Sequence, residues 1–198
     1  IEHAQVVAPE DRGAFATFSI IHSVQPTHAT SDGPWAGQRL GPERERYAYA
    51  YEDLRKTMGL LALGTDFPVE GIDPLATFRS AVYRQDAHGT PPNGYQPGNA
   101  LSPENALRGM TIWNAISTFS EKELGSLEPG KCADFVLLNG DPELMSKPGG
   151  RVRVTATFRT IPAMKERGRT NGDRSDRTER RLACPLWTPP EYEHQPDA

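Results

Sequence analysis

The sequence predicts an α/β protein. Apolar runs alternate with helix-like stretches through the first half of the chain, and glycine or proline marks the junctions between them. Such alternation is typical of sheets whose strands are connected by helices. A chain of 198 residues is also long enough to bury a hydrophobic core.

Three segments of the first half have the apolar character of strands. Residues 1–7 read as an interior strand, and residues 19–24 read as the next one. Residues 60–63 are wholly apolar, as are strands that are buried on both faces of a parallel sheet. This third strand delivers Gly64-Thr65-Asp66 at its carboxyl end.

Helices are expected between these strands. Pro9 is well placed to open a helix over residues 11–18. Pro42 suits the first turn of another, which runs to about residue 57 and is ended by Gly59. Residues 27–41 lack a useful periodicity, so we expect a long loop of the kind that is usually functional or disordered.

A further helix is expected over residues 74–84, followed by a surface loop at 88–99. Ser102 and Pro103 then signal an N-cap and a first helical turn. The apolar residues of this last helix follow three- and four-residue steps, which predicts one buried stripe: Ala106, Met110, Trp113, Ile116 and Phe119. We expect Trp113 and Phe119 to be core residues rather than a binding site.

The pattern changes after a turn that Gly125, Pro129 and Gly130 bracket. Residues 134–139 are apolar enough for a strand, and residues 151–158 alternate as a half-exposed strand does. From residue 161 to 198 the chain is rich in charged residues and proline without an apolar period, which predicts a disordered tail.

Composition argues against partners of extreme charge. The net charge is −4 and the pI is about 5.8, so neither nucleic acid nor a membrane surface is an expected partner. No apolar run approaches the ~18 residues of a membrane span. The chain begins with Ile1, and we expect its true amino terminus to lie upstream. The sequence does not identify the compartment, and the cytoplasm is the expectation.

Several phrases, in this order and spacing, resemble the amidohydrolase superfamily, and in particular the amidohydrolase family 3 branch of N-substituted formamide deformylases. They are IEHAQ at 1–5, QPTH at 25–28, LALGTDFP at 61–68, Pro74-Leu75, Asn114-Ala115 and GSLEPGKCADFVLL at 125–138. The resemblance spans about residues 1–159. It implies a metal-dependent hydrolase of C–N bonds, built on a (β/α)8 barrel.

By this resemblance, residues 1–123 are the carboxy-terminal part of the barrel, with strands six to eight. Residues 124–160 are part of a small β-sandwich domain, and 161–198 are an unrelated tail. The chain is therefore expected to be a fragment of a longer enzyme, because a barrel of this kind takes about 250 residues. Unpaired strand edges favour self-association, so homo-oligomers are expected.

The resemblance also implies the site residues. His3 is a metal ligand, and Asp66 is both a ligand and the proton shuttle. Zinc, as one ion or two, is the expected cofactor, because it accepts imidazole and carboxylate ligands and makes hydroxide available near neutral pH. An amide-type small molecule is the expected substrate, with His28 and Trp35 as substrate-binding residues of the long loop. A plain surface histidine is an equal reading of His28.

Two functions stay open at this point. In the first, the parent enzyme hydrolyses an amide, formamide or cyclic amide through metal-activated water. In the second, the chain is a catalytically inactive remnant, or a binding and assembly module, because it lacks most of the family's metal ligands. Asp66 has the simpler reading of a turn residue, and His22 is interpreted as structural.

Overall fold

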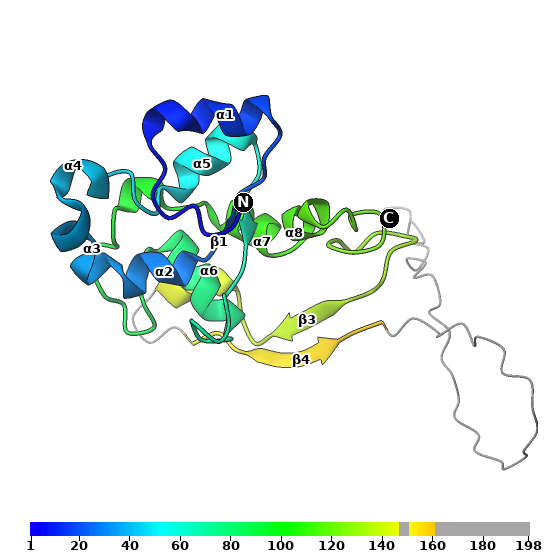
Figure 1. The fold of residues 1–198 in the computed structure, drawn as a ribbon. Coiled ribbons are helices and arrows are strands. Elements are labelled where there is room, and N and C mark those ends of the chain that lie inside the picture. Colours follow the sequence, from blue (N-terminus) through cyan, green and yellow to red (C-terminus); the bar gives the residue numbers. More distant parts are fainter. Residues whose placement is uncertain (147–150, 161–198) are drawn as a thin grey trace, which may run out of the picture.

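A computed structural model describes residues 1–146 and 151–160 of the chain (Figure 1). Short helices enclose a pair of short parallel strands, and an antiparallel strand pair lies to one side of them. The expected mixture of helix and strand is confirmed. None of the helices in the described part is long and apolar enough to cross a membrane. The predicted disordered tail, 161–198, lies outside the described residues.

The parallel pair consists of β1 (Ser23–Val24) and β2 (Ala62–Leu63). Val24 pairs with Leu63, and the amide of Gly64 donates to the carbonyl of Val24 at 2.9 Å. Val24 and Leu63 are both buried, as expected for an interior sheet. Because the two strands are parallel, the residues that follow them emerge at the same edge.

Residues 1–7 do not form the continuous strand that the sequence predicts. The segment makes a parallel bridge from Glu2 to Ser23, and the amide of His3 donates to the carbonyl of Ser23 at 2.7 Å. The backbone of His3 and Ala4 then adopts positive φ, which ends the extended pairing. The beginning of the chain is nevertheless a third segment that runs parallel to β1.

The first predicted helix is present as η1 (Pro9–Asp11) and α1 (Arg12–Thr17). The strand expected at 19–24 is shortened to β1. Ser19 has a φ of 53°, and this left-handed residue turns the chain before the strand can begin.

The prediction of a long loop at 27–41 is wrong. Two helices occupy these residues, α2 (Pro26–Ser31) and α3 (Gly33–Leu40). A proline lies in the first turn of each helix, where its missing N–H leaves no hydrogen bond unmade. Each helix also buries one alanine completely in the core, Ala29 and Ala36. Packing against the core thus stabilises these two helices, although the local sequence pattern does not predict them.

The single helix expected from Pro42 to about residue 57 is instead two, α4 (Pro42–Glu45) and α5 (Tyr51–Met58). Tyr49 lies between them with a φ of 52°, and its amide donates to the carbonyl of Gln5 at 2.6 Å. Pairing with the beginning of the chain therefore interrupts the helix. Its end at Gly59 is as predicted, with a left-handed φ of 86°.

The later helices follow the predicted positions more closely. Asp73 caps α6 (Pro74–Val82), and Ser102 caps α7 (Pro103–Met110) by accepting from the amide of Asn105 at 3.2 Å. The loop at 88–99 contains one 3-10 turn, η2 (Pro97–Asn99).

The apolar stripe extends less far than predicted. Thr111 separates α7 from α8 (Ile112–Ser117), and Trp113 is buried as expected. Phe119 is not a core residue, since it is 93% exposed. The helix has ended by then, at Ser117, and Phe119 itself has a positive φ.

The second strand pair is antiparallel and consists of β3 (Phe135–Leu138) and β4 (Val154–Phe158). Both strands lie where the sequence predicts them, and the rings of Phe135 and Phe158 stack with centroids 4.6 Å apart. In the preceding turn, Lys131 donates to the hydroxyl of Ser126 at 2.6 Å. The described residues do not extend this pair into a β-sandwich, which remains an expectation together with the domain boundaries at 123 and 160.

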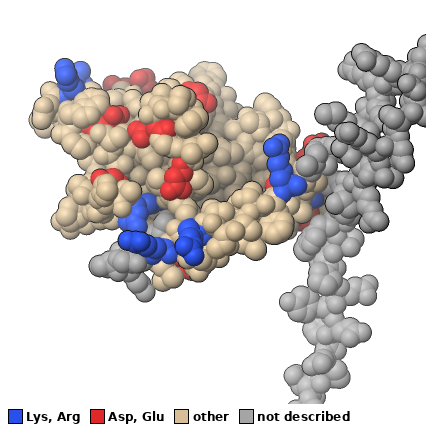
Figure 2. Space-filling model, turned by 90° about the horizontal axis from the view of Figure 1, so that it is seen from below, with Lys and Arg blue, Asp and Glu red and all other residues tan. Residues whose placement is uncertain are grey.

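Acidic and basic side chains both occur on the surface of the main body. On the face shown in Figure 2, aspartate and glutamate occur at several places, and a small group of lysine and arginine side chains lies below them. The net charge of the whole chain is −4.

One charged residue, Arg84, lies fully buried in the core. Its Nε donates to the carbonyl of Tyr95 at 2.8 Å and an Nη donates to the carbonyl of Tyr49 at 3.1 Å. The guanidinium carbon also lies 4.9 Å from the ring centroid of Tyr51. Burial lowers the pKa of Arg84, and the surrounding tyrosines oppose that effect. The guanidinium thus joins three separate segments of the chain.

His22 is a structural residue, in agreement with its interpretation from sequence. Its ring is fully buried, and its centroid lies 4.2 Å from that of Phe15. Neither ring nitrogen has a hydrogen-bond partner. Burial, followed by the nearby terminal ammonium of Ile1, lowers the pKa of His22 from 6.5 to about 4.

We therefore expect the protein to lose stability as the pH falls from 6.5 towards 4. The unfolded chain takes up this proton at the ordinary pKa while the folded protein resists it, so acid favours unfolding and pH above 6.5 has no effect through this group. The loss should reach about 2 kcal/mol near pH 5. Urea unfolding at several pH values measures it, and His22→Phe should flatten this part of the profile. If His22→Phe lost the same stability between pH 6.5 and 4 as the wild type, His22 would not be the cause of the loss.

Candidate metal centre

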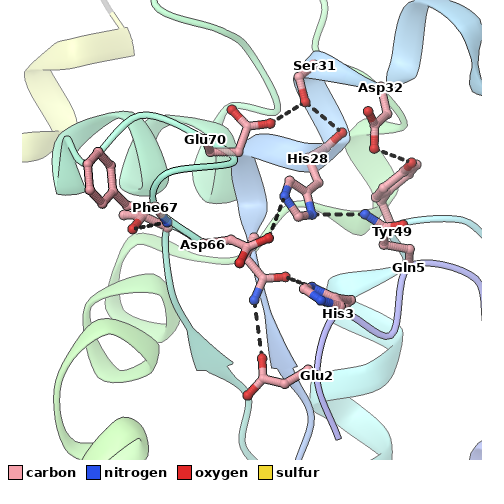
Figure 3. A network of polar contacts seen from close by, with 12 residues as sticks. Glu2, His3, Gln5, His28, Ser31, Asp32, Tyr49, Asp66, Phe67 and Glu70 are labelled. Atoms are coloured by element: carbon pink, nitrogen blue, oxygen red, sulfur yellow. Dashed lines mark hydrogen bonds and ion pairs between the residues drawn. The ribbon is translucent and has the colours of Figure 1, made fainter.

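Three side chains that can ligate a metal meet at the edge where the parallel segments end. The ligand atoms of His3, His28 and Asp66 all lie within 4.8 Å of one another (Figure 3). His3 follows the first paired segment, His28 lies in α2 directly after β1, and Asp66 lies just beyond β2. The edge at the carboxyl ends of parallel strands is where α/β proteins commonly bind ligands.

His3 is held through its Nδ1 atom, which lies 2.9 Å from Oε1 of Gln25. The amide nitrogen of the same glutamine donates to the carboxylate of Glu2 at 3.4 Å. Gln25 is only 5% exposed, and the hydroxyl of Tyr51 donates to its backbone carbonyl at 2.9 Å. His3 itself is exposed, so its second nitrogen can be reached from outside.

His28 is held from the opposite side and is 5% exposed. Its Nδ1 lies 2.9 Å from the amide nitrogen of Gln5. Its Nε2 is buried without a hydrogen-bond partner and lies 3.6 Å from Oδ2 of Asp66. The rings of His28 and His3 are 5.9 Å apart between centroids. A buried ring nitrogen of this kind is a group with unmet bonding capacity that faces a carboxylate.

Asp66 adopts a left-handed backbone conformation, with a φ of 59°, at the point where the chain leaves β2. Its side chain is 31% exposed and points towards the two imidazoles (Figure 3). The next turn is fixed locally, because the amide of Phe67 donates to the hydroxyl of Thr65 at 3.3 Å. The carboxylate is thus partly shielded from water, and it can reach a metal ion that the histidines bind.

Imidazole nitrogen and carboxylate oxygen are the donor types that zinc and similar divalent ions accept. Two ligands at about 2.0–2.2 Å from a tetrahedral zinc ion lie about 3.3–3.6 Å apart. The ligand atoms of the cluster lie within 4.8 Å of one another, which is close to this spacing. The residues present therefore fit a divalent cation.

The predicted site residues are not all brought together. His3, Asp66 and His28 are neighbours, whereas Trp35 lies in α3, is 48% exposed and is not a member of the cluster. Its substrate-binding role stays a prediction.

Sequence reasoning also did not single out Gln5 and Gln25, which contact the two histidines. Gln5 lies in the phrase IEHAQ and Gln25 in the phrase QPTH, next to the two histidines. Their place in these phrases was the only sign in the sequence that they belong to the site.

The model of the amidohydrolase family matches residues 1–157. The chain belongs to the amidohydrolase family. The resemblance in the sequence phrases is thereby confirmed, and the three clustered side chains all lie within the matched part.

Three curated proteins are similar in sequence to this chain. Protein LONG AFTER FAR-RED 3 of Arabidopsis thaliana is 41% identical over 143 residues, which cover 70% of this chain and 24% of the relative. Putative amidohydrolase YtcJ of Bacillus subtilis is 36% identical, with 71% of this chain and 26% of the relative covered. N-substituted formamide deformylase of Arthrobacter pascens is 33% identical over 82 residues, which cover 41% of this chain and 15% of the relative. The chain thus spans about a quarter of the length of the first two relatives.

Solved amidohydrolase-type structures have a similar fold. An uncharacterized metal-dependent hydrolase from Pyrococcus horikoshii is 33% identical, with a TM-score of 0.64, and the match covers 72% of this chain and 29% of that protein. The fold of the described residues is therefore that of a part of such a hydrolase.

Proposed function

We propose that this chain contributes to a metal-dependent amidohydrolase that cleaves non-peptide C–N bonds. His3 Nε2 and the Asp66 carboxylate hold the cation in this proposal, and His28 contacts the substrate. The observation that carries it is the convergence of these side chains, from three separate segments, to within 4.8 Å of one another.

The chemistry follows from the types of group present. A divalent ion such as zinc, when bound, lowers the pKa of water from about 15.7 to about 7 and so supplies hydroxide near neutral pH. Asp66 accepts the proton of the attacking water and transfers it to the departing amine nitrogen, acting first as a base and then as an acid.

An amide, formamide or cyclic amide is the proposed substrate class. The name of the Arthrobacter relative, N-substituted formamide deformylase, supports a formamide. His28 suits the carbonyl oxygen of such a substrate because it is a buried imidazole with an unpartnered nitrogen at the cluster. Trp35 is retained as a proposed contact for the rest of the substrate.

The proposal is tested on the purified chain with two measurements. After zinc loading and extensive dialysis, we expect about one zinc per chain by mass spectrometry, and we expect release of amine from an N-alkylformamide. The double variant His3→Ala/Asp66→Ala should lose both. His88→Ala, which removes an exposed histidine from a surface loop, is the matched control and should retain both.

Two results would count against the enzyme. Retention of zinc without any amine release from formamides, linear amides or cyclic amides would favour the binding-module alternative. Equal zinc content in the wild type and the double variant would show that His3 and Asp66 do not bind the metal.

A further inference from the structure

We infer that Gln25 and Gln5 hold His3 and His28 in opposite tautomers, so that His3 offers a lone pair to the cation whereas His28 offers an N–H to the substrate. The assignment of these roles rests on the proposed function, but the tautomers themselves follow from the hydrogen bonds. Both glutamines are positioning residues in this inference.

The orientation of the Gln25 amide is fixed by Glu2. An ionised carboxylate only accepts hydrogen bonds, so the group that faces Glu2 at 3.4 Å must be the amide nitrogen of Gln25. The amide oxygen then faces Nδ1 of His3 at 2.9 Å. Because that oxygen is also only an acceptor, Nδ1 of His3 carries the proton and its Nε2 carries the lone pair. Metal-binding histidines commonly have this arrangement.

The opposite holds for His28. The amide nitrogen of Gln5 faces Nδ1 of His28 at 2.9 Å, and a donor there requires a lone pair on Nδ1. The proton then lies on Nε2, which faces Oδ2 of Asp66 at 3.6 Å. A proton facing a carboxylate is favourable, whereas a lone pair would be repelled. The hydrogen bond with Gln5 therefore sets the tautomer of His28, and the nearby carboxylate of Asp66 favours the same one.

This arrangement separates the roles of two histidines that lie close together. His3 binds the cation with Asp66. The Nε2 atom of His28 is buried and makes no hydrogen bond, because Oδ2 of Asp66 lies 3.6 Å away, so its N–H is free to donate to the substrate carbonyl oxygen. Such a donor is already oriented and desolvated, so no water must be displaced from it during the reaction.

The tautomers can be read directly in the metal-free chain by nitrogen NMR of ¹⁵N-histidine, which separates protonated from unprotonated ring nitrogens. At about pH 8 we expect protonated Nδ1 in His3 and protonated Nε2 in His28. Signals are assigned with single histidine variants. The same tautomer in both residues, or the reverse assignment, would overturn the inference regardless of whether the chain binds zinc.

Substitution of Gln25 tests its positioning role. Gln25→Leu should leave the tautomer of His3 mixed and weaken zinc binding about 10–100-fold. Gln25→Glu keeps an acceptor at Nδ1, so it should retain the His3 tautomer and bind zinc more tightly than Gln25→Leu. Should Gln25→Leu fail to fold, the NMR assignment and Gln25→Glu still decide, because loss of the His3 tautomer in Gln25→Glu contradicts the inference.

Substitution of Gln5 gives a gain of binding. In Gln5→Glu a carboxylate accepts at Nδ1 of His28 and shifts the proton there, so Nε2 becomes a third metal ligand. We expect zinc affinity to rise about tenfold or more, while Gln5→Leu stays near the wild type. Weaker zinc binding in Gln5→Leu would show that His28 is already a ligand, which would overturn the assignment. An absence of zinc binding in every variant, with the tautomers as stated, would contradict the proposed function alone.

Discussion

Replacing Asp66 with asparagine is expected to lower the rate of amide hydrolysis by about 10²–10⁴-fold, which is the usual contribution of a positioned general acid–base group. Asparagine has nearly the same shape and can still offer an oxygen, but it cannot accept a proton from water. The rate with a saturating N-alkylformamide, measured on zinc-loaded protein, is the relevant quantity. Zinc affinity should fall as well, because the substitution removes the negative charge that faces the imidazoles.

Glu70→Gln is the matched control for this experiment. Glu70 is a neighbouring carboxylate that accepts from the hydroxyl of Ser31 at 2.6 Å but does not belong to the metal cluster (Figure 3). The control should keep its activity within about twofold, as is usual away from the reacting groups. Equal losses in the two variants would mean that local charge, rather than the function of Asp66, explains the effect.

Replacing Arg84 with methionine should destabilise the fold by about 3 kcal/mol or more. Methionine fills much of the space but donates no hydrogen bond, so the carbonyl of Tyr95 loses its partner and the carbonyl of Tyr49 keeps only the amide of Tyr51 at 2.9 Å. A carbonyl left unsatisfied costs about 1–3 kcal/mol, and the lost second hydrogen bond adds about 1 kcal/mol. The interaction of the guanidinium with the Tyr51 ring is lost as well. Urea unfolding at neutral pH measures the change in the free energy of unfolding.

Arg108→Met provides the comparison for Arg84→Met. Arg108 pairs with Glu104 on the surface of α7, where both side chains are more than half exposed. Exposed pairs of this kind contribute about 0–1 kcal/mol. A similar small effect in Arg84→Met would show that the buried guanidinium does not hold the three segments together.

Local signals predicted the ends of several elements well. Gly59 ends α5 and Ser102 begins α7 because a left-handed glycine and a capping serine satisfy backbone groups within a few residues of themselves. The strand expected at 60–63 was predictable from its apolar residues, since four in succession are unsuited to the surface, but only Ala62–Leu63 pair as a strand.

The errors arose where distant segments decide the local structure. The break between α4 and α5 depends on the hydrogen bond from Tyr49 to Gln5, which lie far apart in the sequence. Likewise α2 and α3 are stabilised by packing that the residues 27–41 do not display by themselves. Phe119 was placed in the core because its spacing continues the stripe, but the helix ends first.

For the site, the sequence phrases pointed to His3 and Asp66, and the structure places them next to each other. Their roles as ligand and proton shuttle stay predictions. The part that sequence did not provide is the orientation of the imidazoles. That orientation depends on which amide atom of Gln5 and Gln25 faces each ring, a property of three-dimensional contacts rather than of spacing.

The central claim is that His3 and Asp66 hold one cation together. Anomalous diffraction at the zinc edge, on crystals of the chain grown with zinc, locates the ion directly. We expect a single strong peak at about 2.0–2.2 Å from both His3 Nε2 and a carboxylate oxygen of Asp66. A peak bound elsewhere, with these two side chains free of metal, would contradict the account.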